Sequence, residues 1–202
     1  LILENVVVDS NSSYGLWMGS SNNDQIKVSI SNSVFKNNYT TANNGYGSAI
    51  ISKKNSLNVT NSKFINNYSY AKGSIYLEEE SDDVAFIGCF FKDNKITTST
   101  YGSVFSTKSD LTITDCTFLN NENYVFSGTN WNSTSATIAI LNSIAWNNAL
   151  INSDSWQNIE LSATYSCVEG GFSGTGNISS NPEFCNPFDN NISLSATSPC
   201  IG

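Results

Sequence analysis

The chemically reactive side chains of this sequence are five cysteines, an acidic run and many asparagines, because histidine and arginine are both absent. All nine basic residues are lysines. Enzymes most often transfer protons through histidine, and they often stabilise developing negative charge with arginine. We therefore predict that the chain is not an enzyme and has no catalytic residue.

The acidic run Glu-Glu-Glu-Ser-Asp-Asp occupies residues 78–83. Carboxylate oxygens are ligands that calcium prefers. The candidate ligands are Glu78, Glu80, Asp82 and Asp83. The spacing does not match the calcium loop of an EF-hand, so we favour a solvated surface loop and predict no metal or cofactor.

The number of cysteines is odd, so at least one has no disulfide partner within the chain. Cys89 and Cys116 occupy the same position in successive copies of the repeat that is described below. Stacked strands about 4.8 Å apart would place them within disulfide range, with a reduced pair as the alternative. We also predict that Cys167 pairs with Cys200, which leaves Cys185 free or bonded to another chain.

Several asparagines begin an Asn-X-Ser/Thr sequence, the acceptor for N-glycosylation in secreted eukaryotic proteins. The predicted glycosylation sites are Asn58, Asn132, Asn177 and Asn191. Asn11, Asn38 and Asn67 also begin such sequences, but they occupy one position of a repeat.

That repeat is an alternating apolar run, a polar corner, an aromatic residue and a pair of asparagines. Its corner residues are Asn5, Asn32, Asn61, Gly88, Asp115 and Asn142. The step from one corner to the next is nearly constant at about 27 residues, which is typical of a solenoid. Apolar residues alternate with a period of two, which predicts strands rather than helices.

These features predict an all-β fold, a parallel β-helix with about seven coils over residues 1–176. We expect residues 177–202 to form an irregular C-terminal segment that covers the last coil. Because the sequence begins within a repeat and without Met, we expect it to be a processed product or a segment of a longer chain.

Stacked coils would place equivalent residues above one another in the interior. The predicted small-residue column contains Ser33, Ser62, Cys89, Cys116, Ser143 and Cys167. The predicted aromatic ladder contains Phe35, Phe64, Phe91 and Phe118. The predicted amide ladder contains Asn38, Asn67, Asn94 and Asn121. For the asparagines that begin glycosylation sequences, an outward glycan is the alternative, and we favour the buried ladder.

The Phe-X-X-Asn repeat, followed by Gly-Ser at Gly47, Gly73 and Gly102, resembles the FxxN and GGA(I/L/V) repeats of chlamydial polymorphic outer membrane proteins and adhesin-like surface proteins. Residues 165–171, 181–184 and 198–202 are similar to the closing segment of secreted right-handed β-helix repeat proteins. The resemblance implies a right-handed parallel β-helix on a cell surface, and it implies no particular ligand.

Together these observations favour a non-catalytic extracellular module, either a rigid stalk or a filament subunit at the cell surface. Residues 1–3 would leave an apolar strand edge at one end, so we expect end-to-end contact with neighbouring coils or with another copy. A net charge of −8 argues against nucleic acid, and no apolar run is long enough to insert into a membrane.

Two alternative functions involve carbohydrate. A glycan-binding adhesin would stack sugars on exposed aromatic residues. The candidates are Tyr39, Tyr46, Tyr68, Tyr70 and Trp131. A polysaccharide lyase or hydrolase, by comparison with other β-helix enzymes, would need a basic catalytic group or aspartates that recur in one column. Neither requirement is evident in the sequence, so we place the enzyme last.

Overall fold

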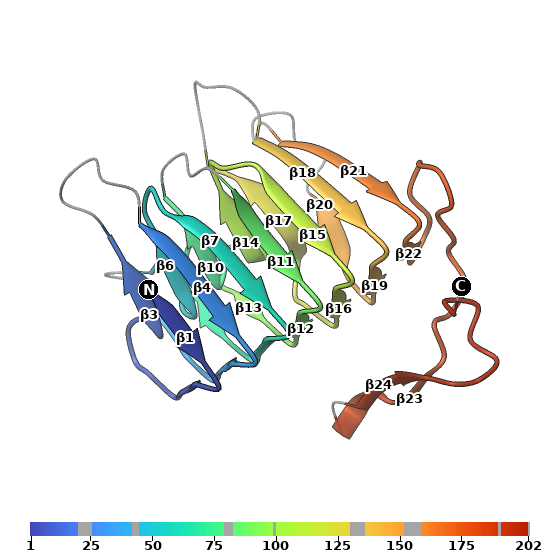
Figure 1. Ribbon diagram of the computed structural model, residues 1–202, viewed down its shortest axis with the longest axis horizontal. Helices are drawn as coiled ribbons and strands as arrows, with labels where there is room; N and C mark the ends of the chain where they lie inside the picture. Colours follow the sequence, from blue (N-terminus) through green and yellow to red (C-terminus); the bar gives the residue numbers. More distant parts are fainter. Residues whose placement is uncertain are drawn as a thin grey trace.

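The computed structural model describes residues 1–19, 26–41, 45–78, 83–98, 100–129, 136–151, 159–189 and 191–201. Its strands wind into a parallel β-helix whose coils stack along one axis, from the N-terminal end to a C-terminal segment (Figure 1). The predicted all-β solenoid is therefore confirmed. None of the described residues forms a helix with the length and apolarity that a membrane crossing needs.

Three parallel sheets form the sides of the coils. Sheet A contains β1 (Ile2–Glu4), β4 (Lys27–Ser31), β7 (Ser56–Thr60), β11 (Val84–Ile87), β15 (Leu111–Thr114), β18 (Ala136–Leu141) and β21 (Ile159–Thr164). Sheet B contains β2 (Val7–Asp9), β5 (Val34–Lys36), β8 (Lys63–Ile65), β12 (Phe90–Lys92), β16 (Thr117–Leu119), β19 (Ile144–Trp146) and β22 (Cys167–Val168). Sheet C contains β3 (Leu16–Met18), β6 (Ile50–Ser52), β10 (Ile75–Leu77), β14 (Gly102–Thr107), β17 (Tyr124–Gly128) and β20 (Ala149–Ile151). A short pair, β9 (Tyr68–Ser69) and β13 (Lys95–Ile96), lies between sheets B and C in the chain.

Two left-handed corners in each coil explain the repeat. The first corners are Asn5, Asn32, Asn61, Gly88, Asp115, Asn142 and Tyr165, and the second are Ser10, Asn37, Asn66, Asp93, Asn120, Asn147 and Gly170. All have φ between 48° and 77°. Asparagine, aspartate and glycine tolerate this conformation best, which accounts for the polar corner and for the first asparagine of each pair.

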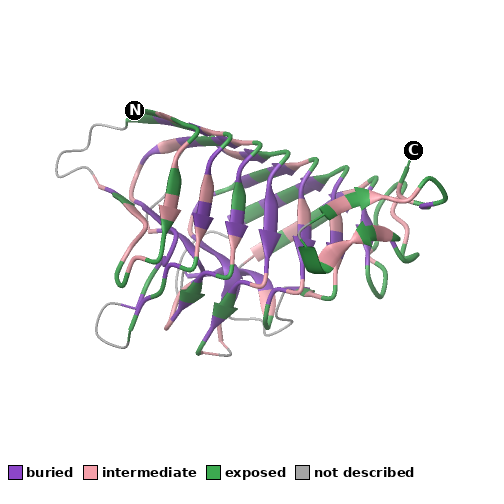
Figure 2. Cartoon of the chain, turned by 90° about the horizontal axis from the view of Figure 1, so that it is seen from below, coloured by how far each residue is buried: buried purple, intermediate pink, exposed green. Residues whose placement is uncertain are grey.

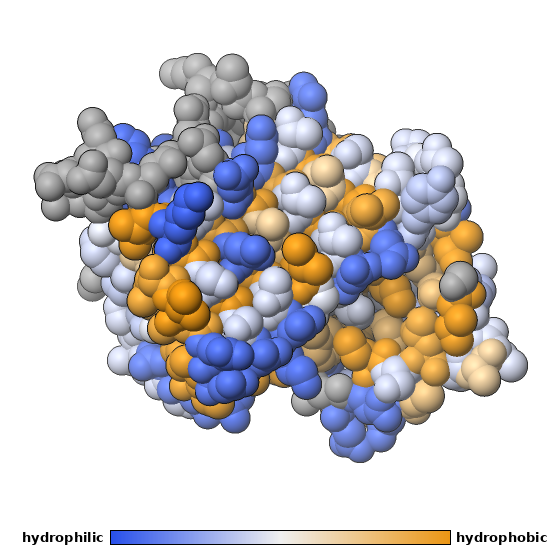
Figure 3. All heavy atoms as spheres, viewed as in Figure 1, coloured by the Kyte–Doolittle hydropathy of each residue, from blue (hydrophilic) through white to orange (hydrophobic). Residues whose placement is uncertain are grey.

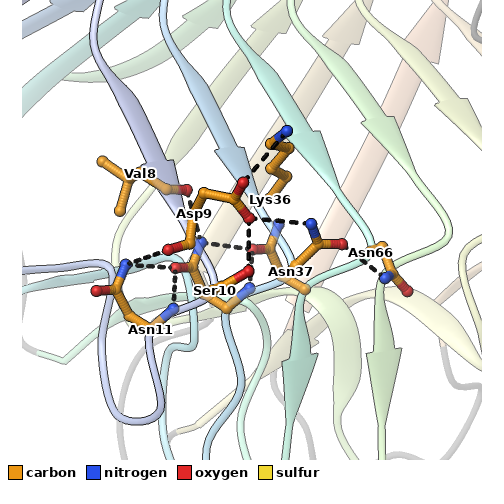
Figure 4. A network of polar contacts seen from close by, with 9 residues as sticks. Val8, Asp9, Ser10, Asn11, Lys36, Asn37 and Asn66 are labelled. Carbon is orange, nitrogen blue, oxygen red and sulfur yellow. Dashed lines mark hydrogen bonds and ion pairs between the residues drawn. The ribbon is translucent and has the colours of Figure 1, made fainter.

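The second corners are also joined from coil to coil on the outside of the helix (Figure 4). Asn66 donates from Nδ2 to Oδ1 of Asn37 at 2.8 Å, and Asn37 donates to Asp9 at 3.0 Å. Asp9 also forms an ion pair with Lys36 at 3.2 Å. The hydrogen bond from Asn37 makes the largest contribution to lowering the pKa of Asp9, and Lys36 lowers it further. The corner residues therefore set the backbone bend and link neighbouring coils.

The aromatic ladder lies in the interior, as predicted. Phe35, Phe64, Phe91 and Phe118 are fully buried. Their successive ring centroids are 5.1, 5.1 and 4.7 Å apart, and the rings stack nearly parallel. Phe105 of sheet C contacts Phe91 edge-on at 5.3 Å, so rings from two sheets fill the narrow core.

The amide ladder is also inside. Asn67 donates from Nδ2 to Oδ1 of Asn94 at 3.1 Å and to the carbonyl of Phe35 at 3.0 Å. Its own Oδ1 accepts from the amide and from Nδ2 of Asn38. The same pattern recurs at Asn94 and Asn121. Because both Nδ2 protons are used in a buried site, Asn38 and Asn67 belong to the ladder and are not positioned to carry a glycan.

The small-residue column requires one correction. In the last coil Ser166, not Cys167, continues the column, because the amide of Ser143 donates to Oγ of Ser166 at 3.1 Å. Cys167 instead pairs with Ile144 in the neighbouring row. The prediction was wrong because the final coil is shorter, which moves its corner to Tyr165.

The C-terminal segment is more ordered than predicted. Oδ1 of Asn177 accepts from the amide of Ser166 at 3.0 Å and so caps the small-residue column. The chain then forms an antiparallel hairpin of β23 (Phe184–Asn186), the 3-10 turn η1 (Pro187–Asp189) and β24 (Asn191–Leu194). In Figure 2 buried residues are concentrated in the middle of the stack, while exposed residues are frequent at both ends.

Candidate functional site

The outer face of sheet A carries two carboxylates side by side. Asp83 and Asp110 precede equivalent strands on adjacent coils and line one shallow groove of about 680 Å³. Oδ1 of Asp110 accepts from the amide of Thr137 at 2.6 Å. The expectation that aspartates do not recur in one column was therefore wrong, because Asp83 and Asp110 stand one repeat apart and each directly precedes its strand of sheet A.

Of the four candidate calcium ligands, Glu80 and Asp82 lie outside the described residues, whereas Glu78 and Asp83 are described. The described part of the chain contains no group of three or more histidine, cysteine, aspartate or glutamate side chains arranged to hold a metal.

The predicted sugar-stacking tyrosines lie in two groups, while Trp131 is outside the described residues. Tyr39 and Tyr68 pair on adjacent coils and are 44% and 40% exposed. Tyr46 is exposed beside Tyr76 of sheet C, with ring centroids 5.5 Å apart. Tyr70 is half-buried.

A lysine occupies the centre of the second group. Nζ of Lys72 lies 5.6, 4.9 and 5.0 Å from the ring centroids of Tyr46, Tyr76 and Tyr101. Ring faces attract a cation, but burial removes its hydration. Burial, with a smaller contribution from Lys108, lowers the pKa of Lys72 to about 8.

Lys72 should make stability depend on pH. Its folded pKa of about 8 lies below its ordinary value of 10.5, so the unfolded chain binds more protons between these pH values. The free energy of unfolding should therefore rise with pH through this window. Urea unfolding at pH values near 8 and near 10.5 should show a smaller rise in the free energy of unfolding for Lys72→Met than for the wild type. An equal rise in the wild type and the variant would contradict this assignment.

All five cysteines are free thiols, so neither predicted pair is bonded in the structure. For Cys89 and Cys116 the reason is geometric, because both side chains point into the interior like the serines of their column. Cys116 Sγ contacts the carbonyls of Phe86 and Thr114 and accepts from the amide of Cys89. A hydrogen bond with Cys89, together with burial, raises the pKa of Cys116.

Cys167 and Cys200 lie close together in a pocket of about 480 Å³ between the last coils and the C-terminal segment. Burial and a hydrogen bond between the two raise the pKa of Cys167 to about 12. Cys185 is exposed.

The predicted glycosylation sites have different surroundings. Asn58 and Asn191 are exposed on β7 and β24, and Asn132 is outside the described residues. Asn177 is half-buried, and its Nδ2 donates to the carbonyls of Ala163 and Phe172. The structure therefore argues against glycosylation of Asn177, because its amide is part of the cap.

One cleft was not anticipated. It has a volume of about 520 Å³ and lies between sheet B and the C-terminal hairpin. Its lining residues are Leu119, Asn120, Trp146, Asn147, Glu169, Asn181, Glu183, Phe184, Pro187 and Phe188. The available sequence signal was the change from phenylalanine to Ala145 in the aromatic ladder, followed directly by Trp146.

Comparison with known proteins gives one match. A family model described as a right-handed beta helix region matches residues 2–191. No curated protein and no solved structure matches the chain. The match supports the fold and handedness that the resemblance implied, whereas the particular surface-protein families are not matched.

Proposed function

Because this chain belongs to the right-handed beta helix family, we propose that it is a non-catalytic structural and adhesive module outside the cell, serving as a stiff stalk or filament subunit at the cell surface. The main support is that successive coils are joined in three ways along one axis. The amide ladder joins them by side-chain hydrogen bonds, the aromatic ladder by stacked rings, and the three sheets by parallel strand pairing. Such a solenoid resists bending, because each coil is fixed to its neighbours.

The two ends of the stack differ in a way that favours end-to-end assembly. At the N-terminal end the inward Leu3, Val8 and Leu16 are only partly buried, and Ile2 is 78% exposed. Hydrophobic atoms are visible at this end of the molecule (Figure 3). At the other end residues 175–178 hydrogen-bond to the last coil, and Asn177 caps the small-residue column. Further coils or a second copy would bury the apolar end, and contact of this head-to-tail kind builds filaments.

We expect the chain to self-associate as its concentration rises, and Leu3→Lys to abolish this, because the substitution puts a charge on the apolar end. Light scattering after size-exclusion chromatography measures the mass directly. Lys27→Ser, on the outer face of sheet A, is the control and should associate like the wild type. A monomer at every concentration for both the wild type and the control would contradict end-to-end assembly.

The non-catalytic part of the proposal is tested separately. Incubation with a panel of acidic and neutral polysaccharides, with and without calcium, should release no unsaturated or reducing ends. Cleavage that Asp110→Asn removes would instead make the groove at Asp83 and Asp110 a catalytic site.

Glycan binding is the second candidate, favoured by the exposed rings of Tyr39 and Tyr68. Their pairing on adjacent coils presents two aromatic faces on one side of the rod. A glycan array probed with the wild type and with Tyr68→Ala tests this candidate. Binding that survives the substitution would exclude this surface.

A further inference from the structure

We propose that the cleft between sheet B and the C-terminal hairpin binds a small organic ammonium ion. Its floor is one outward row of sheet B, in which Leu119, Trp146 and Glu169 come from three successive coils. The facing wall is Phe184, Pro187 and Phe188 of the hairpin. A volume of about 520 Å³ is within the range of sites for small ligands.

The charge of the cleft favours a cation over a neutral ligand. Glu169 and Glu183 both line it, and neither forms an ion pair with a lysine in the part of the chain that the structure describes. One lysine borders the cleft, because Lys92 pairs with Leu119 in the same outward row, and its Nζ lies 3.5 Å from the carbonyl of Phe188. That ammonium group also pairs with Asp93 at 3.4 Å, so its charge is compensated there.

The two carboxylates are held in place by neutral donors. Glu169 Oε2 accepts from the amide of Asn147 at 2.6 Å. Glu183 Oε2 accepts from the hydroxyls of Thr197 and Ser195, both at 2.7 Å. These bonds lower the pKa of Glu183, with the largest contribution from Thr197, so the carboxyl group is ionised at neutral pH.

The backbone of Glu183 is itself strained, with φ of 53° in a residue type that seldom adopts this conformation. Its amide donates to Oδ1 of Asn181 at 2.9 Å, and its carbonyl accepts from Ser195 at 3.0 Å. Strain of this kind persists where the surroundings fix it, and these bonds hold Glu183 at the edge of the cleft.

Aromatic rings beside these charges complete the arrangement. Trp146 is half-buried, while Phe188 is 88% exposed at the cleft, an unusual position for a large apolar side chain. The faces of such rings attract organic cations, and indole does so most strongly. The protein already places Lys72 among three tyrosine rings, so it contains one example of this interaction.

Choline is the probe, and its uncharged tert-butyl isostere, dimethylbutanol, is the matched control ligand. We expect choline to bind to the full chain by calorimetry and the isostere to bind at least about tenfold more weakly, because only choline carries the charge that the ring faces and the carboxylates attract. Added salt should weaken choline binding.

Trp146→Ala and Glu169→Gln should each weaken choline binding about tenfold, with Trp17→Ala as the control that leaves it unchanged. Circular dichroism checks that each variant is folded, and the comparison of the two ligands needs no variant. Equal binding of choline and its isostere, or no binding of choline, would overturn the proposal. Tighter binding of a methyl glycoside would also overturn it and make the cleft a sugar site.

Discussion

Replacing Asn67 with alanine should destabilise the protein by about 3–6 kcal/mol, because several buried groups lose their partners at once. The amide and Nδ2 of Asn38 would lose an acceptor, and the carbonyl of Phe35 would lose a donor. Each buried polar group left without a partner costs about 1–3 kcal/mol. Urea unfolding followed by circular dichroism would measure the loss.

The neighbouring Asn66 provides the matched control. It has the same side chain, but it is exposed and occupies a left-handed corner with φ of 53°. Glycine adopts that conformation freely, so Asn66→Gly should cost about 1 kcal/mol or less. If Asn67→Ala costs no more than Asn66→Gly, the buried amide ladder does not stabilise the fold in the way described.

Phe91→Ala should cost about 3–5 kcal/mol, the usual range for removal of a buried ring. Phe91 is fully buried and stacks between Phe64 and Phe118 at 5.1 and 4.7 Å. It also contacts Phe86 and Phe105, so a cavity there would reach all three sides of the coil. Thermal and urea unfolding would both report the loss.

Two comparisons make this prediction specific to packing. Phe91→Leu should lose much less than Phe91→Ala, because leucine fills most of the volume. Phe188→Ala should change stability by about 0.5 kcal/mol or less, because that ring is 88% exposed. Equal losses at Phe91 and Phe188 would contradict the ladder as a stabilising element.

The fold could be predicted from the sequence because every coil has the same two local requirements. A left-handed corner needs asparagine, aspartate or glycine, and a narrow interior needs a flat ring above a flat ring. Both requirements recur at a nearly fixed period and are therefore visible without a structure. The aromatic and amide ladders followed directly from this alignment.

The surface could not be predicted in the same way. Asp83 and Asp110 stand one repeat apart in the sequence, so their alignment was visible, but the groove that they line on sheet A was not. The cleft at Trp146 depends on the C-terminal hairpin, which contains no repeat and folds back over sheet B. Cys167 was misplaced for a related reason, since the last coil departs from the period.

The spacing of the two corners also bears on how such a chain can evolve. The two corners of a coil are always separated by the same short stretch, as between Asn32 and Asn37. From the second corner to the next first corner the distance varies, and it is longer from Asn37 to Asn61 than from Asn147 to Tyr165. Insertions and deletions in the connections between the strands of this longer stretch leave the ladders intact, so these connections are free to diverge while the rod keeps its shape.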